Sequence, residues 1–523
     1  MMAGMWIANV WRMRRFGKLV GVATLLAFLS GCTLDRQLHH GDEVSQVKPQ
    51  ESPYLKAHYK NGNVAILSQW SFDPAKNEVA GFGELRDMHR KSLSSGPMRI
   101  PVGDVAIFES NKKVANGGVF AAMTLVTVAS AAVTIACLAN PKACFGSCPT
   151  FYVSDGGKDY LAAEGFSESV APSLEATDVD ALWRAKFTGN TAHLRVTNEA
   201  LETHAIRQAN LLVARKPANG RVLATPDGHY REAFEFSPPL SCVASEGDCL
   251  SAVRASDALE RISVTDGKDL ATKETVDLTF DPAPTSEQRG ILLEVRQGFI
   301  TTYLFYQALA YMGRSAGSYI AAMEQGSGEV RDKARALYHL LGGIEVQTRD
   351  GRGEWKTVGT YLETGPLARE VQVVPLPIGQ NGRSIRLIMA RGHFRLGQVA
   401  LVSLGQTVSP ERIAPFTIAT IHGDADSAQQ WIAGGTPFLT TLPGDEHVLT
   451  YQLPTEGNNL EFFLETRGYY LEWMRQSWLA EESDWKLGKL FTWPAMAMKD
   501  LAPIYKQIEP TIEKLFWESR YVR

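Results

Sequence analysis

The N-terminal segment most constrains what this 523-residue chain can become, because it decides the compartment in which the rest folds. Basic residues between Arg12 and Lys18 precede an uncharged, apolar stretch from Leu19 to Phe28. A basic region followed by an apolar region of roughly 7–15 residues is the pattern of an export signal. We therefore expect an exported chain in which residues 1–31 act as a signal peptide.

The apolar stretch ends in Leu29-Ser30-Gly31-Cys32, which resembles the lipobox of bacterial lipoprotein precursors. The resemblance implies that Cys32 is acylated and that its lipid holds the chain at a membrane. Each buried methylene contributes about 0.8 kcal/mol, so several acyl chains anchor stably. Because Thr33 rather than an aspartate follows Cys32, the resemblance also implies the outer membrane, facing the periplasm or the cell surface. The alternatives are a plain secretory signal and a short anchor with an incidental cysteine.

The charge of the chain argues against nucleic acid as a partner. There are 53 basic and 57 acidic residues, which gives a net charge of -4. They are dispersed along the chain, so no strong positive field is expected. The length predicts about two to four domains.

Five cysteines remain after Cys32, and two close pairs stand out, Cys144 with Cys148 and Cys242 with Cys249. Disulfides persist in an exported chain, so both pairs are predicted to be structural disulfides, with Cys137 left free. For the first pair, a metal site, redox chemistry and free thiols remain as alternatives. The string C-F-G-S-C-P-T-F-Y resembles a signature of uncharacterised exported bacterial domains, which implies a β-hairpin and no activity.

An uncharged run from Val119 to Ala139 is long enough to span a bilayer. A crossing there would return both cysteine pairs to the reducing cytoplasm, and Asn140-Pro141 ends the run cleanly. We therefore predict a buried or interface-lying helix, with a true membrane span as the alternative.

The remaining patterns predict a mixed α+β fold of mostly antiparallel β structure. Two β-sandwich-like regions are joined by a helical segment and followed by an aromatic-rich helical tail. The predicted segments are a lipidated tether (32–52), an N-terminal β region (53–118), an apolar helix (119–140), a disulfide-containing β-sandwich (141–285), a helical segment (286–342), a second β-sandwich (343–454) and the tail (455–523).

Residues 343–405 contain a G-x-W segment at Gly353 to Trp355 and later alternating strands, and they resemble galactose-binding-like jelly rolls. The resemblance implies a sugar site near Trp355. A plain sandwich without a ligand is the alternative.

The tail is dense in aromatic residues, and the spacing of Tyr470, Trp473 and Trp478 predicts a helix. Pro510 is predicted to begin a last helix. Packing of the tail onto the preceding sandwich is the first interpretation. A partner interface and a platform for sugar or peptide, with Trp473 as a contact, are the others.

We find no nucleophile elbow, phosphate loop or metalloprotease motif, and we predict no cofactor and no metal site. Glu465 and Glu472, about two helical turns apart, are the best catalytic pair. For Glu472, a surface carboxylate or one paired with Arg467 or Arg475 is the alternative. Asp424 and Asp426 form an acidic cluster that a simple turn also explains.

We therefore expect a lipid-anchored envelope protein with a non-enzymatic binding or assembly role and an envelope protein or glycan as partner. The alternatives are a carbohydrate-binding or carbohydrate-active lipoprotein and a component inserted in the membrane by residues 119–139.

Overall fold

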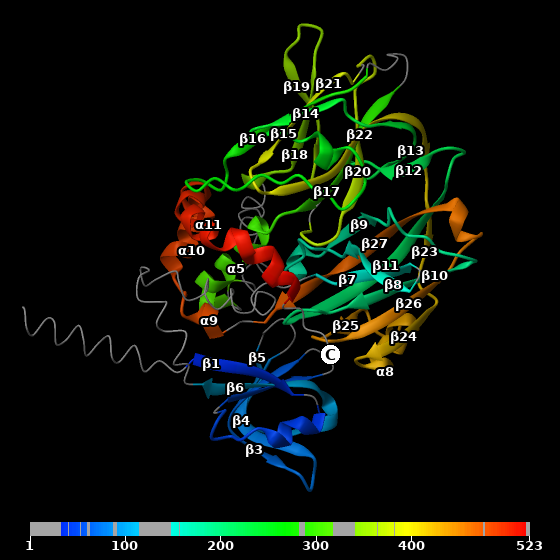
Figure 1. Cartoon of the computed structure of the whole chain (residues 1–523). Helices are drawn as coiled ribbons and strands as arrows, with labels where there is room; N and C mark the ends of the chain where they lie inside the picture. Colours follow the sequence, from blue (N-terminus) through cyan, green and yellow to red (C-terminus); the bar gives the residue numbers. More distant parts are fainter. Residues whose placement is uncertain are drawn as a thin grey trace, which may run out of the picture. The chain divides into compact units, whose positions relative to one another are not determined.

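The structure is a computed structural model of the whole chain (Figure 1). The residues that it describes are 33–39, 41–52, 54–59, 63–86, 92–114, 148–155, 157–281, 288–316, 319, 340–362, 365–380, 382–473 and 476–518. The chain divides into two compact units, one of residues 1–87 and 92–131 and the other of residues 88–91 and 132–523. Each unit is described by itself.

The first unit is a six-stranded antiparallel sheet in the order β1-β6-β2-β3-β4-β5. Burial alternates along β2 and β3, so one face carries a core around Leu55, Leu67 and Trp70. The strands are β1 (Thr33–His39), β2 (Tyr54–Tyr59), β3 (Val64–Asp73), β4 (Glu78–Arg86), β5 (Ser92–Pro101) and β6 (Val105–Val114), with short 3-10 turns η1 (Gly41–Gln46) and η2 (Val102–Asp104).

The predicted tether at 32–52 is wrong over most of its described length. Residues 33–39 form β1, which pairs with β6 from Thr33 opposite Val114 to His39 opposite Phe108. Backbone hydrogen bonds hold an edge strand whatever its side chains are, so the polar, unperiodic sequence gave no sign of it.

The second unit begins with two facing sheets. One has the order β24-β26-β10-β7-β8, and the other has the order β23-β11-β27-β9 with β25 also paired to β11. Phe151 and Leu449 from the first sheet pack with Leu211 and Phe462 from the second, which makes a β-sandwich. The strands are β7 (Thr150–Asp155), β8 (Lys158–Glu164), β9 (Ala176–Ala181), β10 (Thr191–Thr197), β11 (Glu202–Arg215), β23 (Glu411–Ile413), β24 (Thr417–His422), β25 (Leu439–Thr441), β26 (Glu446–Gln452) and β27 (Leu460–Glu472).

A closed barrel, β12-β13-β22-β17-β20, and a six-stranded sheet, β15-β14-β16-β21-β18-β19, complete the β structure of this unit. Ile291 and Leu401 of the barrel share one core with Leu278 and Leu387 of the sheet. The strands are β12 (Arg221–Ala224), β13 (Tyr230–Ser237), β14 (Ser241–Ala244), β15 (Gly247–Asp248), β16 (Lys273–Thr279), β17 (Arg289–Gln297), β18 (Ile344–Arg349), β19 (Trp355–Tyr361), β20 (Glu370–Pro375), β21 (Ser384–Ala390) and β22 (Phe394–Val408).

The predicted fold class, mostly antiparallel β with helices, is confirmed. The predicted boundaries at 285 and 343, however, do not separate the sheets. β10 pairs with β26, and β16 pairs with β21, so strands on both sides of the helical segment share one sheet. Alternation along a strand reports its burial and not its partner, which is why the sequence suggested two sequential sandwiches.

Helices gather beside these sheets (Figure 1). α5 is buried on nearly all sides, as expected for a helix enclosed by others. Its core includes Trp478, Tyr505 and Phe516, so these tail residues pack inward, as the first interpretation of the tail predicts. The helices are α4 (Leu250–Val253), α5 (Ile300–Met312), α8 (Ala425–Ile432), α9 (Gln476–Leu479), α10 (Asp484–Thr492) and α11 (Pro494–Glu518), with 3-10 turns η4 (Pro172–Leu174), η5 (Gly313–Ser315) and η6 (Gly457–Asn459).

The first part of the tail is a strand and not a helix. β27 runs from Leu460 to Glu472, between β11 and β9. β27 is buried on both faces, so its large side chains show no strict alternation, and the adjacent pairs Phe462-Phe463 and Tyr469-Tyr470 match helical spacing by chance. Pro510 lies inside α11 together with Pro503, so it does not begin the last helix.

The apolar run at 119–139 lies outside the described residues, as do Cys32, Cys137 and Cys144. Among the helices of the described part, none has both the length and the hydropathy needed to cross a bilayer.

Candidate functional site

Three large apolar side chains face solvent where α10 meets α11. The exposed fractions are 69% for Trp485, 50% for Trp493 and 53% for Met496, and the two indole rings lie 6.1 Å apart. We call these three residues the aromatic corner. Exposed large apolar side chains that cluster, unlike scattered ones, indicate a contact surface.

The sequence builds this corner from an amphipathic helix and a sharp turn. The Ser483 hydroxyl accepts a hydrogen bond from the Lys486 amide at 3.3 Å and so caps the start of α10. Leu487 and Leu490 point into the core, which leaves Trp485 on the outer side. Trp493 stands between the two helices, and Pro494 opens α11 with a residue suited to a first helical turn.

The helices that carry the corner pack with α5 on a buried core. Rings of α5 stack on rings of the tail, with centroids 5.1 Å apart for Tyr303 and Tyr505 and 5.3 Å apart for Tyr306 and Trp478. Aromatic pairs at these distances add about 0.5–1.5 kcal/mol each beyond their buried area. A partner would therefore meet a surface that is already ordered.

Two of the lysines beside the corner are paired within the chain. Lys489 forms an ion pair with Asp500, and Lys486 lies 3.6 Å from Glu481 and 5.3 Å from the Tyr311 ring. Lys499, three residues after Met496 on α11, is exposed, so the corner is an apolar surface with a cation at its edge.

The predicted catalytic pair does not exist. Glu465 and Glu472 are seven residues apart on β27, so they point to opposite faces and lie about 23 Å apart at ~3.3 Å per residue. Glu465 pairs with Arg412 at 2.7 Å, and Arg467, a predicted partner of Glu472, pairs with Glu175 instead. Glu472 is 3% exposed and accepts a hydrogen bond from the Tyr306 hydroxyl at 2.5 Å. A glycosidase needs its two carboxyls about 5–10 Å apart across an open site.

The two predicted sugar contacts are also covered. The Trp473 side chain is 7% exposed and donates to the Thr203 hydroxyl at 2.9 Å. The Trp355 ring carries the guanidinium groups of Arg349 and Arg386 at 4.7 and 4.4 Å. The Trp473 ring is therefore buried, and the Trp355 ring, which is half-buried, already contacts two guanidinium groups.

Thr441, His204 and Glu202 resemble a catalytic triad. The His204 ring lies 2.8 Å from the Glu202 carboxylate and 3.0 Å from the Thr441 hydroxyl. All three side chains are at most 1% exposed, on strands in the middle of the sandwich. A nucleophile must meet its substrate, so this group is a buried structural network.

No three His, Cys, Asp or Glu side chains come together as a metal site within the described part of the chain. The acidic cluster has a local explanation, because the Asp424 carboxylate accepts the amides of Asp426 and Ser427 and so caps α8.

Two buried carboxyls lie where β9 approaches β20. Both carboxylate oxygens of Glu370 accept hydrogen bonds from the Ala181 amide, at 2.9 and 2.8 Å. Burial, together with the nearby Asp178 carboxylate, raises the pKa of Glu370 well above its usual value. Burial raises the pKa of Asp178 to about 6, and a hydrogen bond from the Val179 amide partly opposes this rise. The Oδ2 atom of Asp178 is shielded from solvent.

This pair predicts a pH dependence that Asp178→Asn should remove. The folded chain keeps a proton on Asp178 up to about pH 6, whereas the unfolded chain loses it near pH 3.8. The free energy of unfolding therefore falls as the pH rises from about 3.8 to about 6, by at most about 3 kcal/mol in total. We expect Asp178→Asn to raise the melting temperature at pH 7.5 and to change it little at pH 4.5. An equal shift at both pH values would contradict this.

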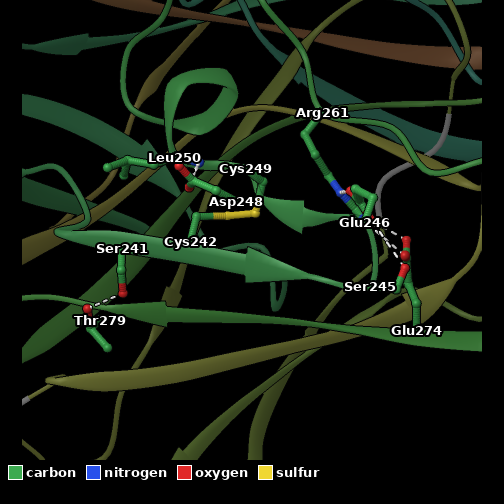
Figure 2. The surroundings of a disulfide bond; sticks show 10 residues. All are labelled: Ser241, Cys242, Ser245, Glu246, Asp248, Cys249, Leu250, Arg261, Glu274 and Thr279. Carbon is green, nitrogen blue, oxygen red and sulfur yellow. Dashed lines mark hydrogen bonds and ion pairs between the residues drawn. A yellow bond between two sulfur atoms is a disulfide. The ribbon is translucent and has the colours of Figure 1, made fainter.

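The second predicted disulfide is confirmed. Cys242 and Cys249 are bonded across the hairpin of β14 and β15 (Figure 2). Figure 2 also shows Arg261 between Glu246 at the tip of the hairpin and Glu274 on β16. The disulfide therefore holds a hairpin that contributes one carboxylate to a buried arginine.

Loss of this disulfide should be measurable. The bond joins residues separated by seven positions, for which loop-closure entropy gives about 2.5 kcal/mol. We expect the free energy of unfolding of the double variant Cys242→Ser, Cys249→Ser to be lower by that amount. Urea denaturation of the variant and the wild type measures the difference. Dithiothreitol should lower the wild type to the same stability and leave the variant unchanged; a further loss in the variant would point to another bond.

The first predicted disulfide is corrected. Cys148 carries a free thiol that is 6% exposed and packs in the sandwich core with Phe151 and Leu194, so it is not bonded to Cys144. Burial, together with the carboxylates of Glu164 and Glu202, raises the thiol pKa, which keeps it neutral and unreactive. The hairpin implied by the C-F-G-S-C-P resemblance is present, formed by β7 and β8.

Sequence reasoning missed Met496, Asp178 and Glu370. Met496 had a usable signal, because the helical spacing of Met498, Leu501 and Tyr505 defines the inner side of α11 and leaves Met496 outside it. Asp178 and Glu370 had none, because they meet across 192 positions only through the packing of β9 against β20.

Comparisons with known proteins add little. No protein-family model matches this chain, and no curated protein matches it. A solved structure of a mutant Salmonella alpha-2-macroglobulin aligns with 78% of the chain at 11% identity and a TM-score of 0.12. The chain spans 24% of that protein's length. A TM-score this low carries no argument about fold or function.

Proposed function

We propose that this chain is a lipid-anchored protein of the bacterial envelope with a non-enzymatic role in binding or assembly. The aromatic corner is the observation that supports it: three exposed apolar side chains on helices that pack on a buried core. Large aromatic side chains are the residue types that contribute most energy at interfaces.

The resemblance of residues 29–32 to a lipobox supports the anchor, and the predicted outer-membrane destination follows from Thr33. The disulfide at Cys242 and Cys249 is consistent with an exported chain, because disulfides are rare in reducing compartments. The carbohydrate-active alternative has less support, because its predicted acids lie apart and its predicted aromatic contacts are covered.

Anchoring and binding are tested together in cells. We expect the wild type in the membrane fraction and Cys32→Ala in the soluble fraction. A photoreactive residue at position 485 or 493 should cross-link to a defined envelope component, whereas the same residue at exposed position 158 or 268 should not. Equal cross-linking at all four positions would contradict a role for the aromatic corner, and a soluble wild type would contradict the anchor.

A further inference from the structure

A cavity of about 430 Å³ lies away from the aromatic corner, between two loops of the sandwich and one strand of the barrel. The loop from Lys216 to Gly220 joins β11 to β12 and forms one wall. Asn458 and Asn459, just before β27, form the opposite wall, and Phe236 of β13 lies between them. This volume falls within the range of small-molecule sites, roughly 300–1,000 Å³.

Lys216 gives this cavity an uncompensated positive charge. No carboxylate within the described residues forms an ion pair with its half-buried ammonium group. Burial lowers the pKa of Lys216, the nearby Glu461 carboxylate raises it, and Arg221 and Lys186 lower it further.

Glu461 cannot serve as the missing partner, because Arg221 already holds it. The Arg221 guanidinium contacts both oxygens of this carboxylate, with its Nε atom 2.7 Å from Oε2. The same guanidinium lies 3.7 Å over the Trp183 ring. A half-buried ammonium beside a carboxylate that is already occupied favours an anion from outside the chain.

The other lining groups suit hydroxyls. Asn219, Asn458 and Asn459 line the cavity and are exposed, and each side-chain amide can donate and accept hydrogen bonds. The Phe236 ring adds an apolar surface, with Trp183 behind it at 6.4 Å. Arg221 also lines the cavity, but Glu461 pairs with it, so the lining offers one cation without an ion pair, several amides and one ring. These groups match a small ring-shaped ligand that carries hydroxyls and one negative group.

The walls are held in place before any ligand arrives. The Lys216 amide donates to the Asn459 carbonyl at 3.0 Å, which ties the two loops together. Asn219 is held in the left-handed region at φ 59°, and the Gly220 amide closes the turn on the Pro217 carbonyl at 3.1 Å. A pre-formed site loses less entropy on binding.

We propose that this cavity binds an anionic sugar of monosaccharide size, with Lys216 contacting its acidic group, the three asparagines contacting its hydroxyls and Phe236 packing on its ring. A sugar acid and a sugar phosphate share this chemistry. The site is separate from the aromatic corner, and the proposal does not depend on the role of that surface.

Calorimetric titration of the purified full chain tests the proposal with galacturonate, glucose 6-phosphate and glucose. We expect one of the two anions to bind at least tenfold more tightly than glucose, and the tighter anion identifies the source. Lys216→Gln should weaken the binding of that anion at least tenfold. The matched removal of an exposed charge, Lys158→Gln, should leave it unchanged.

The double variant Asn458→Ala, Asn459→Ala keeps the charge and should weaken the anion and glucose alike. An unchanged melting temperature for Lys216→Gln shows that the variant is folded. Absence of binding to wild type at millimolar ligand, equal affinity for glucose and the anions, or unchanged binding in folded Lys216→Gln would each overturn the proposal.

Discussion

Trp478→Ala is expected to lower the free energy of unfolding of the second unit by about 3–5 kcal/mol. Trp478 is fully buried, at 0% exposure, and its ring lies 5.3 Å from that of Tyr306. It belongs to the core that joins α5 to the tail, so its removal opens a cavity that neighbouring strands and helices cannot easily close. Urea unfolding followed by tryptophan fluorescence and by circular dichroism measures the loss.

Trp485→Ala is the matched control for this prediction. Both residues are tryptophans of the tail, only seven positions apart, but Trp485 is 69% exposed. We expect a change within about 0.5 kcal/mol, as for most surface substitutions. A large loss in Trp485→Ala would mean that the aromatic corner is part of the core and would remove the basis of the proposed function.

This contrast marks what the tail sequence could reveal. Its aromatic density correctly predicted a core, because large apolar side chains must be buried by something. It did not separate Trp478 from Trp485, since that distinction depends on the Ser483 cap and on which side of α10 meets α5. Close spacing of two cysteines predicted the disulfide correctly at Cys242 and Cys249, but the same signal was wrong at Cys144 and Cys148.

Long-range pairing was the part that the sequence could not supply. β11 pairs with β27 from Glu202 opposite Glu472 to Arg215 opposite Leu460, across about half of the chain. Nothing in either strand specifies the other, because each is a mixture of polar and apolar residues that becomes buried only in the folded sheet. The candidate pair at Glu465 and Glu472 was wrong for this reason, and Lys216 was missed because its cavity exists only when the β11–β12 loop meets Asn459.

Arg261→Met should be as damaging as the loss of Trp478, for an electrostatic reason. Arg261 is 4% exposed and makes two hydrogen bonds of 2.7 Å to Glu274 and two, of 2.6 and 2.9 Å, to Glu246. Burial lowers the pKa of Arg261, but the bonds to Glu274 and Glu246 raise it overall, so the guanidinium stays charged. Its removal leaves the Glu274 carboxylate, which is buried, without its counter-charge, and we expect a loss of about 3–5 kcal/mol.

Two further variants separate the cost of an orphaned charge from the value of the ion pair. Arg386→Met removes an equally bidentate pair with Asp277 on the same sheet, but those side chains are 27% and 44% exposed, so about 1 kcal/mol or less should be lost. The double variant Arg261→Met, Glu274→Met removes the stranded carboxylate and should recover most of the stability. If the double variant is no more stable than Arg261→Met, the stranded Glu274 carboxylate is not the dominant cost. Arg261 would then stabilise the fold chiefly through its bond to Glu246 on the disulfide-closed hairpin.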